Sequence, residues 1–346
     1  MDFNKLRALS PGQGFGTVET IDMHTEGEPL RVIIDGLPLI EGATILEKRR
    51  YFREHYDSIR RTLMFEPRGH ADMYGAILTE PVTEGADFGT FFIHNEGYST
   101  MCGHAIIALV KLALDSGFVD RKGDAPIVEI DAPPGRIRAM ARRNKGIVES
   151  VSFRNVPSFV LFQDRVVDVP GIGRIEFDLA FGGAFYAFCE AAPLGLNLEA
   201  SDYNKLIDYG RRIKNAIAEN YNIVHPYEAE LGFLYGTIFV GAPYSHSNFS
   251  RNVCVFAEGE VDRSPTGSGV SARAALHYSK NEIRINEKLT IEGILGTIMD
   301  VEVVDILEYG NHKAVVPQVT GTSYYTGKNS FWIDRSDPLI DGFIFR

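Results

Sequence analysis

The chain contains one feature twice: a polar turn that runs directly into a helix built from small and apolar residues. The first turn is Ser99–His104, and the helix predicted after it spans Ala105–Ser116. The second turn is Ser264–Gly269, and its helix continues through Val270–Leu276. A helix that is apolar on almost every side is buried on every side. We therefore expect the chain to wrap around a central helix in each of two places.

The residues at the two helix starts also match. Thr100 is a favourable N-cap with Cys102 two positions later, and Ser264 is followed by Pro265, which suits the first helical position, and by Thr266. The free backbone N–H groups and the dipole at a helix N-terminus favour a thiolate and attract a carboxylate. Cys102 and Thr266 hold matching places, so we expect two helix starts to face one anion-binding cleft between the halves.

The segments around these helices repeat in the same order. Strands and one helix are predicted in the first half at Val18–His24, Leu30–Ile34, Glu41–Met64 (the helix), Met73–Leu78, Thr90–His94, Ile127–Ala132, Arg136–Met140 and Ile147–Phe153. The second half has matching segments at Arg174–Leu179, Ala184–Cys189, a helix capped by Ser201, Leu234–Val240, Asn252–Phe256, Leu289–Glu292, Thr297–Leu307 and Ala314–Val316. Repeats of this length are far too long for a solenoid.

The predicted fold class is therefore α+β, with two similar halves that each curl a sheet around a central helix. The first domain is predicted over residues 1–180 and carries Cys102. The second is predicted over residues 181–332 and carries Asp262 and Thr266, while residues 333–346 are expected to pack back on the first.

Charge and cysteine content exclude several classes of function. The net charge of −11 argues against nucleic acid or an anionic membrane as a partner, although a site can be locally positive and bind a small anion. Three cysteines do not form a disulfide framework. No apolar run has the length of a signal peptide or a membrane span. We expect a soluble, cytoplasmic protein that acts on a small molecule.

Four stretches resemble signatures of the proline racemase family: Gly97–Ala105, Asp262–Gly269, His24–Arg31 and Glu66–Gly75. The resemblance covers nearly the whole chain. It implies the diaminopimelate-epimerase-like fold with two pseudo-symmetric domains, an active site in the cleft between them, no organic cofactor, no metal and a homodimer. The best-known members exchange the Cα proton of a cyclic imino acid with two cysteines, one on each face.

The sequence departs from that pattern at Thr266, which stands where the second cysteine is expected. A thiol ionises near pH 8.5, whereas an unactivated aliphatic hydroxyl is far too weak an acid and base to move a proton at Cα. The pairing of Cys102 with Thr266 resembles the branch of the family that dehydrates trans-3-hydroxy-L-proline to pyrroline-2-carboxylate. The resemblance therefore implies a hydro-lyase activity.

The stereochemistry of this substrate needs only one thiol. The carboxylate and the hydroxyl of trans-3-hydroxy-L-proline lie on opposite faces of the ring, so the Cα hydrogen shares a face with the leaving hydroxyl. Cys102 is expected to take that proton as general base and to act on the departing oxygen as general acid. Thr266 binds on the other face, and the enamine formed first tautomerises to the cyclic imine.

The resemblance assigns the remaining roles position by position. Backbone N–H groups of four residues are expected to hold the substrate carboxylate and the negative charge that builds on it, namely Gly103, His104, Gly267 and Ser268. Asp262 is expected to pair with the ring NH2⁺, and Tyr74 to lie on the wall of the pocket. Cys189 and Cys254 lie in apolar runs and are interpreted as core residues.

Two alternatives stay open. In the first, the chain is a proline racemase or a 4-hydroxyproline epimerase in which another group replaces the second cysteine. In the second, it is a non-catalytic amino-acid binding protein, a hypothesis disfavoured because Cys102 and Asp262 are both present. Thr266 itself could serve only as a polar residue at a helix start.

Overall fold

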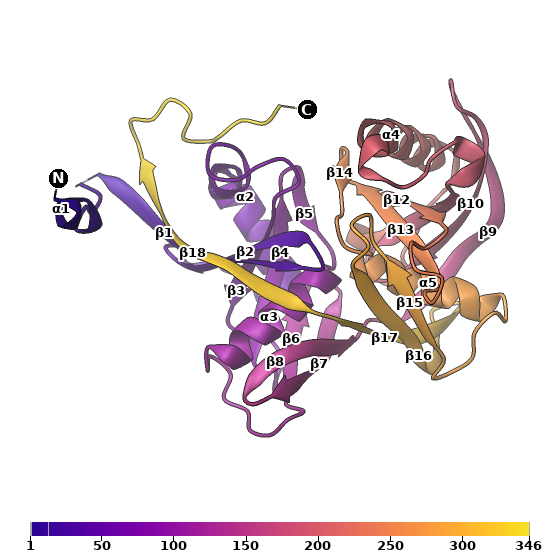
Figure 1. Cartoon of the computed structure of the whole chain (residues 1–346), viewed down its shortest axis with the longest axis horizontal. Helices are drawn as coiled ribbons and strands as arrows, with labels where there is room; N and C mark the ends of the chain where they lie inside the picture. The colour runs from indigo at the N-terminus through magenta and orange to yellow at the C-terminus, as the bar shows by residue number, and fades with distance from the viewer. Residues whose placement is uncertain (1, 13, 346) are drawn as a thin grey trace.

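The computed structural model describes residues 2–12 and 14–345, and it consists of two halves that lie side by side (Figure 1). The N-terminal half is defined by the elements β1 (Phe15–Thr25), β2 (Glu28–Asp35), α2 (Ile45–Met64), β3 (Tyr74–Thr79), β4 (Phe88–His94), β5 (Gly97–Ser99), α3 (Gly103–Asp115), β6 (Ile127–Ala132), β7 (Gly135–Asn144), β8 (Ile147–Arg154) and β18 (Ser323–Asp334). A short helix, α1 (Phe3–Arg7), precedes them and stands apart from the rest in Figure 1.

The C-terminal half is defined by the elements β9 (Ser158–Val169), β10 (Gly173–Phe181), β11 (Phe185–Glu190), α4 (Tyr203–Asn220), β12 (Leu234–Gly241), β13 (Ser250–Phe256), β14 (Glu260–Val261), α5 (Gly267–Ser279), β15 (Lys288–Glu292), β16 (Ile298–Tyr309) and β17 (His312–Gly321). Short 3-10 turns lie between some of these elements, at Ala192–Leu194, Ala200–Asp202 and Ala229–Leu231.

Strand pairing confirms the repeat that the sequence predicts. β1 pairs antiparallel with β18 as β10 does with β9, and β2 pairs parallel with β3 as β11 does with β12. β4 pairs parallel with β6 as β13 does with β15, and an antiparallel run of three strands follows in each half. The predicted α+β architecture with two similar halves is therefore present.

The chain crosses between the halves twice. After β8 the chain crosses into the C-terminal half as β9, and after β17 it returns as β18 along β1 (Figure 1). The two halves are joined by β17, which pairs with β9 near one end and with β8 at the other.

By this pairing, residues 158–180 belong with the second half rather than the first, and the return to the first half begins at Ser323 rather than at 333. The predicted boundaries differ because a strand that crosses between sheets carries no composition signal of its own. Beyond β18 the chain packs back on the N-terminal half, where Glu66 N donates to Phe343 O at 3.0 Å. Met1, Gln13 and Arg346 fall within the predicted ranges but lie outside the described residues.

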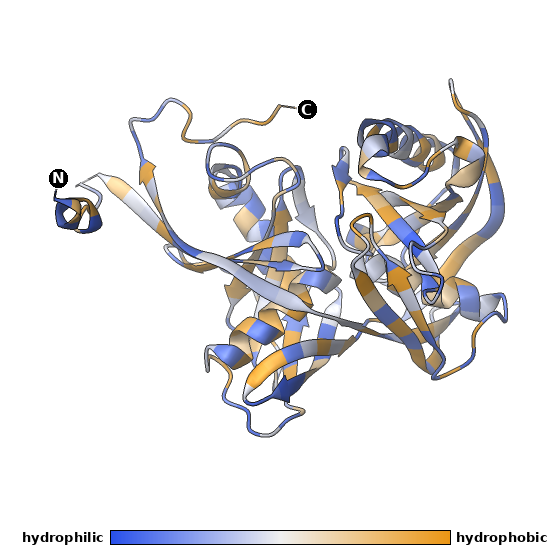
Figure 2. Ribbon diagram, viewed as in Figure 1, coloured by the Kyte–Doolittle hydropathy of each residue, from blue (hydrophilic) through white to orange (hydrophobic). Residues whose placement is uncertain are grey.

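The two central helices are buried as the composition predicts. Gly103 to Leu114 of α3 and Gly267 to Leu276 of α5 are all buried. Even Lys111 is buried, with its Nζ donating to Asp115 at 2.8 Å and to Val148 O at 2.7 Å. In Figure 2 the hydrophobic colour concentrates on strands and helices inside each half, whereas α4 on the outside carries much hydrophilic colour. No helix in the described ranges is long and apolar enough to cross a membrane.

The predicted N-caps, Thr100 and Ser264, are wrong by two residues. The observed N-caps are Cys102 and Thr266. Thr100 Oγ1 instead donates to Gly183 O at 2.7 Å, and Ser264 Oγ accepts from Thr266 N at 3.1 Å. Both hydroxyls are therefore engaged outside the helix, but the match between Cys102 and Thr266 is kept.

Candidate active site

The N-termini of α3 and α5 touch each other at two glycines. A Cβ on Gly103 would lie 2.7 Å from Gly267 Cα, and a Cβ on Gly267 would lie 2.7 Å from Gly103 Cα. Any larger residue would push the helices apart. The first N–H groups of a helix have no partner within the helix, so donors from two helices converge here at the positive ends of two dipoles. Such a place suits a carboxylate.

A cavity of about 20 Å³ lies beside this contact. All eight residues predicted for the site line it: Tyr74, Cys102, Gly103, His104, Asp262, Thr266, Gly267 and Ser268. Four further residues that the sequence did not point to complete the lining: Met101, Tyr186, Tyr235 and Phe256. This volume suits about one water molecule, so a ring-sized ligand enters only when the two halves separate.

Cys102 is the N-cap residue of α3, and its side chain is 4% exposed. Its Sγ accepts from Ala105 N at 3.3 Å and lies 3.2 Å from His104 Nδ1. Burial raises the pKa of the Cys102 thiol well above its ordinary value, against the Ala105 N–H and the neighbouring Tyr74 hydroxyl, which lower it. The expectation that the helix start favours a thiolate is therefore wrong for the closed cleft, because loss of solvent outweighs the helix terminus.

Negative neighbours add to this effect. The carboxyl groups of Asp262 and Glu28 both raise the pKa of the Cys102 thiol. A cation placed beside these carboxyl groups would oppose their effect and favour the thiolate.

His104 follows Cys102 by two residues and is equally buried. Burial lowers the pKa of the His104 imidazole to about 4, although Asp262 and a hydrogen bond to the Pro29 backbone act in the opposite direction. The ring is therefore neutral near pH 7, and the pair with Cys102 is not the ion pair of thiolate and imidazolium found where a histidine activates a cysteine.

Thr266 holds the matching N-cap position on α5 with φ of +69°. The left-handed region is unfavourable for a β-branched residue, and such strain is concentrated at functional sites. Thr266 is 5% exposed, and its Oγ1 has no hydrogen-bond partner among the described residues. It neighbours the Cys254 thiol, whose pKa burial raises and the Thr266 hydroxyl lowers.

Asp262 forms one end of a buried group of carboxylates. Its Oδ1 accepts from Ser264 N at 2.8 Å, and its side chain is 4% exposed. Glu28 lies nearby and accepts from Arg263 N at 2.7 Å; burial first, and then Asp262, raises the pKa of its carboxyl well above the usual value. Arg263 lowers the pKa of the Glu28 carboxyl and forms an ion pair with Asp72 at 2.7 Å, so Asp262 is the carboxyl group that remains to bind a ligand cation. Glu28 lies inside one of the family signatures, but no sequence pattern singles it out.

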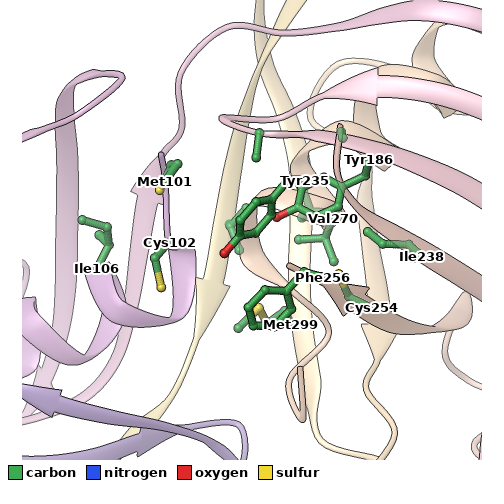
Figure 3. Packing of buried hydrophobic residues seen from close by; sticks show 14 of the residues in the cluster. Met101, Cys102, Ile106, Tyr186, Tyr235, Ile238, Cys254, Phe256, Val270 and Met299 are labelled. Atoms are coloured by element: carbon green, nitrogen blue, oxygen red, sulfur yellow. The ribbon is translucent and has the colours of Figure 1, made fainter. Parts of the chain in front are cut away.

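Aromatic rings form the wall opposite the helix starts. Tyr186 (β11) places its hydroxyl 2.7 Å from Ser268 Oγ, and Tyr74 hydrogen-bonds through its hydroxyl to Ser99 Oγ. Tyr235 (β12) stacks on Phe256 with ring centroids 5.3 Å apart. Figure 3 shows the ring of Tyr235 extending from the C-terminal half toward Cys102.

One signal could have revealed Tyr235. β3 begins with Tyr-Gly-Ala-Ile at residues 74–77, and its counterpart β12 contains Tyr-Gly-Thr-Ile at residues 235–238. Tyr235 is thus the repeat partner of Tyr74. Each ring stacks on the last residue of the next strand, Tyr74 on His94 and Tyr235 on Phe256.

In the part of the chain that the structure describes, no group of three or more His, Cys, Asp or Glu side chains is placed to hold a metal ion. Cys189 and Cys254 are both fully buried in strands, in agreement with their interpretation as core residues.

Comparison with known proteins decides the family. The family model described as proline racemase matches residues 20–344. The chain belongs to the proline racemase family. Its predicted fold class is confirmed by a solved family structure, a hydroxyproline epimerase from Agrobacterium vitis with bound trans-4-hydroxy-L-proline. That structure matches with a TM-score of 0.89 at 27% identity, covering 95% of this chain and 96% of the other.

Curated relatives of this proline racemase family member carry two kinds of name. A trans-3-hydroxy-L-proline dehydratase of Colwellia psychrerythraea is 51% identical, covering 96% of this chain and 94% of the relative. A trans-L-3-hydroxyproline dehydratase of Xenopus tropicalis is 46% identical over 99% of both chains. A 3-hydroxyproline 2-epimerase of Burkholderia multivorans is 43% identical, covering 95% of this chain and 98% of the relative.

Proposed function

We propose that this protein is a trans-3-hydroxy-L-proline dehydratase that forms pyrroline-2-carboxylate. The observation that carries the proposal is the asymmetry of the two matching N-caps, with Cys102 on α3 and Thr266 on α5 at one buried cavity. One face of a bound Cα then meets a thiol and the other meets only a hydroxyl. The names of the dehydratases from Colwellia and Xenopus support the same substrate and reaction.

Substrate binding follows from the charges of the site. The carboxylate accepts from the N–H groups of Gly103 and His104 on α3 and of Gly267 and Ser268 on α5. These donors also stabilise the enediolate-like charge that develops when the Cα proton leaves. The ring NH2⁺ pairs with Asp262, which is buried at the same cavity.

Binding of the ring NH2⁺ also prepares Cys102 for catalysis. In the closed cleft burial raises the pKa of the thiol, and the carboxyl groups of Asp262 and Glu28 raise it further. The cation of the substrate compensates this negative charge and lowers the cost of the thiolate. Cys102 then takes the Cα proton, the electron pair forms the double bond to the adjacent ring carbon, and the hydroxyl leaves from the same face.

Thr266 binds on the opposite face without carrying a proton. A hydroxyl that is not activated stays protonated at neutral pH, so inversion at Cα is blocked. The second candidate function is epimerisation at Cα, which the name of the Burkholderia relative favours. That reaction needs a proton donor on the Thr266 face.

One incubation in D2O separates the candidates. The protein is supplied in parallel with trans-3-hydroxy-L-proline and with L-proline, and imine formation, Cα deuterium and configuration are measured. The proposal predicts imine from the hydroxylated substrate and no inversion of either compound. Deuterium at Cα with inversion and without imine would establish an epimerase or racemase, and binding without either product would contradict both enzymatic functions.

A further inference from the structure

Tyr235 carries a hydroxyl that the proposed roles leave unused. The residue is 6% exposed and lines the cavity. Within residues 2–12 and 14–345, no hydrogen bond of good geometry satisfies its Oη, although the hydroxyl of Tyr74 is a neighbour. A buried hydroxyl without a hydrogen-bond partner costs free energy, on the order of 1–3 kcal/mol. The presence of such a hydroxyl in the cavity therefore points to a ligand atom that forms the missing hydrogen bond.

Most other polar groups of the cavity already have a proposed role, and the proposed function puts the Thr266 hydroxyl, which also lacks a partner among the described residues, on the opposite face of the substrate. The helix N–H groups hold the carboxylate, Asp262 holds the ring cation, and Cys102 faces the Cα hydrogen. Tyr74 and Tyr186 have their hydroxyls bound to Ser99 and Ser268, respectively. The substrate brings one more polar group, the 3-hydroxyl. It lies on the same face as the Cα hydrogen, and Tyr235 extends toward Cys102 from the opposite half (Figure 3).

We propose that the Tyr235 hydroxyl hydrogen-bonds the 3-hydroxyl of the substrate and protonates it as it leaves. This inference rests on the proposed function and adds the general acid for its leaving group. A hydroxide ion is a poor leaving group, and a positioned acid that converts it to water contributes about 10²–10⁴-fold to a rate. Burial raises the pKa of the Tyr235 phenol well above its ordinary value, so the phenol carries its proton at neutral pH and can donate it to the leaving oxygen.

Tyr74 can return a proton from Cys102 to Tyr235, so the protons of the reaction balance. Cys102 gains the Cα proton, the electron pair of the Cα–H bond forms the ring double bond, and the C3–O pair leaves with the oxygen. The leaving oxygen takes the phenolic proton of Tyr235 and departs as water. The hydroxyl of Tyr74 neighbours both the Cys102 thiol and the Tyr235 hydroxyl, so it can pass the proton of the thiol back to Tyr235. No co-reactant is needed, and the starting state of the enzyme is restored.

A leaving group that needs no proton tests the assignment. Tyr235→Phe removes only the phenolic oxygen, and we expect it to slow dehydration of trans-3-hydroxy-L-proline by about 10²-fold or more. Elimination of fluoride from trans-3-fluoro-L-proline gives the same imine without protonation of the leaving atom, so we expect it to fall less than about 10-fold. Both rates are read as imine formed by the same protein sample, so fluoride elimination also reports that the site is folded.

Tyr186→Phe is the matched control, because it removes a cavity hydroxyl from the same half that is already bound to Ser268. Any loss it causes should affect the two substrates equally. Equal slowing of both substrates by Tyr235→Phe would show a structural role and overturn the inference, and so would unchanged dehydration. If the unmodified protein dehydrates nothing, the proposed function itself fails, and that outcome is distinguishable because no variant is needed to observe it.

Discussion

Replacing Thr266 with cysteine should give this protein the second proton carrier that it lacks. The hydroxyl of an alcohol ionises about as reluctantly as water, whose pKa is roughly 15.7, whereas a thiol ionises near 8.5. The substitution therefore makes the group on the far face of Cα more acidic by roughly seven orders of magnitude. We expect Thr266→Cys to invert L-proline at least about 10-fold faster than the unmodified protein.

The structure also sets the cost of this change. Loss of the Thr266 methyl group removes about 0.8 kcal/mol of buried apolar contact. The change also removes a buried hydroxyl that lacks a hydrogen-bond partner within the described chain. Removing it should stabilise the folded state by an amount similar to the loss from the methyl group. The free energy of unfolding should thus change by less than about 1 kcal/mol. Burial raises the pKa of the adjacent Cys254 thiol, so the introduced thiol should also need alkaline pH to ionise.

Chiral analysis of proline after prolonged incubation under reducing conditions measures the inversion. Thr266→Ser is the matched control, because it loses the same methyl group and keeps a hydroxyl, and it should not invert proline. Dehydration should survive in both variants, since its proton transfers lie on the Cys102 face. If the unmodified protein already inverts proline as fast as it dehydrates the 3-hydroxy compound, the reasoning about Thr266 is refuted.

The remaining predictions concern the ionisation and the position of Cys102. Cys102 must be deprotonated to act as the base, and the pKa of its thiol is raised in the closed cleft. We therefore expect kcat/KM for dehydration to keep rising with pH through the ordinary thiol range near 8.5. A plateau already reached at pH 6 would contradict this expectation. Glu28→Gln removes a carboxyl that raises the pKa of the thiol, so it should move this rise to lower pH, and a shift to higher pH would show that Glu28 acts otherwise. Pyrrole-2-carboxylate is flat at the carbon that bears its carboxylate, as the transition state is, so it should compete with substrate and slow alkylation of Cys102. Alkylation at an unchanged rate under saturating ligand would place the thiol outside the binding site.

Much of this architecture could be predicted because the sequence repeats the same order of elements in both halves. Two polar turns before two apolar helices predict the two halves, and Cys102 and Thr266 mark the same position in each. The exact helix starts could not be predicted, because Thr100 bonds to the distant Gly183 carbonyl and Ser264 accepts in a local turn from the N–H of Thr266, rather than capping the helix. The cytoplasmic location and the homodimer stay predictions.

The exchange of β9 and β18 between the halves was also outside the reach of sequence patterns. A strand has the same composition whichever sheet it joins. β18 pairs with β1 at the other end of the chain, and β9 pairs with distant β17 as well as with its neighbour β10. The same limit applies to Glu28 and Tyr235. Glu28 becomes functionally suggestive only through its burial and its neighbours, and the repeated Tyr-Gly-x-Ile marks Tyr235 as the counterpart of Tyr74 but does not show that its hydroxyl reaches the cavity.

The most direct test of the whole account is the rate of imine formation by Cys102→Ser. Sγ of Cys102 is the thiol at the cavity, and the serine variant keeps an oxygen that can still accept from Ala105 N and cap α3. The folded state should therefore persist, as circular dichroism and thermal unfolding would show. We predict that imine formation from trans-3-hydroxy-L-proline falls to background. A folded variant that keeps most of the original turnover would contradict the central role of Cys102.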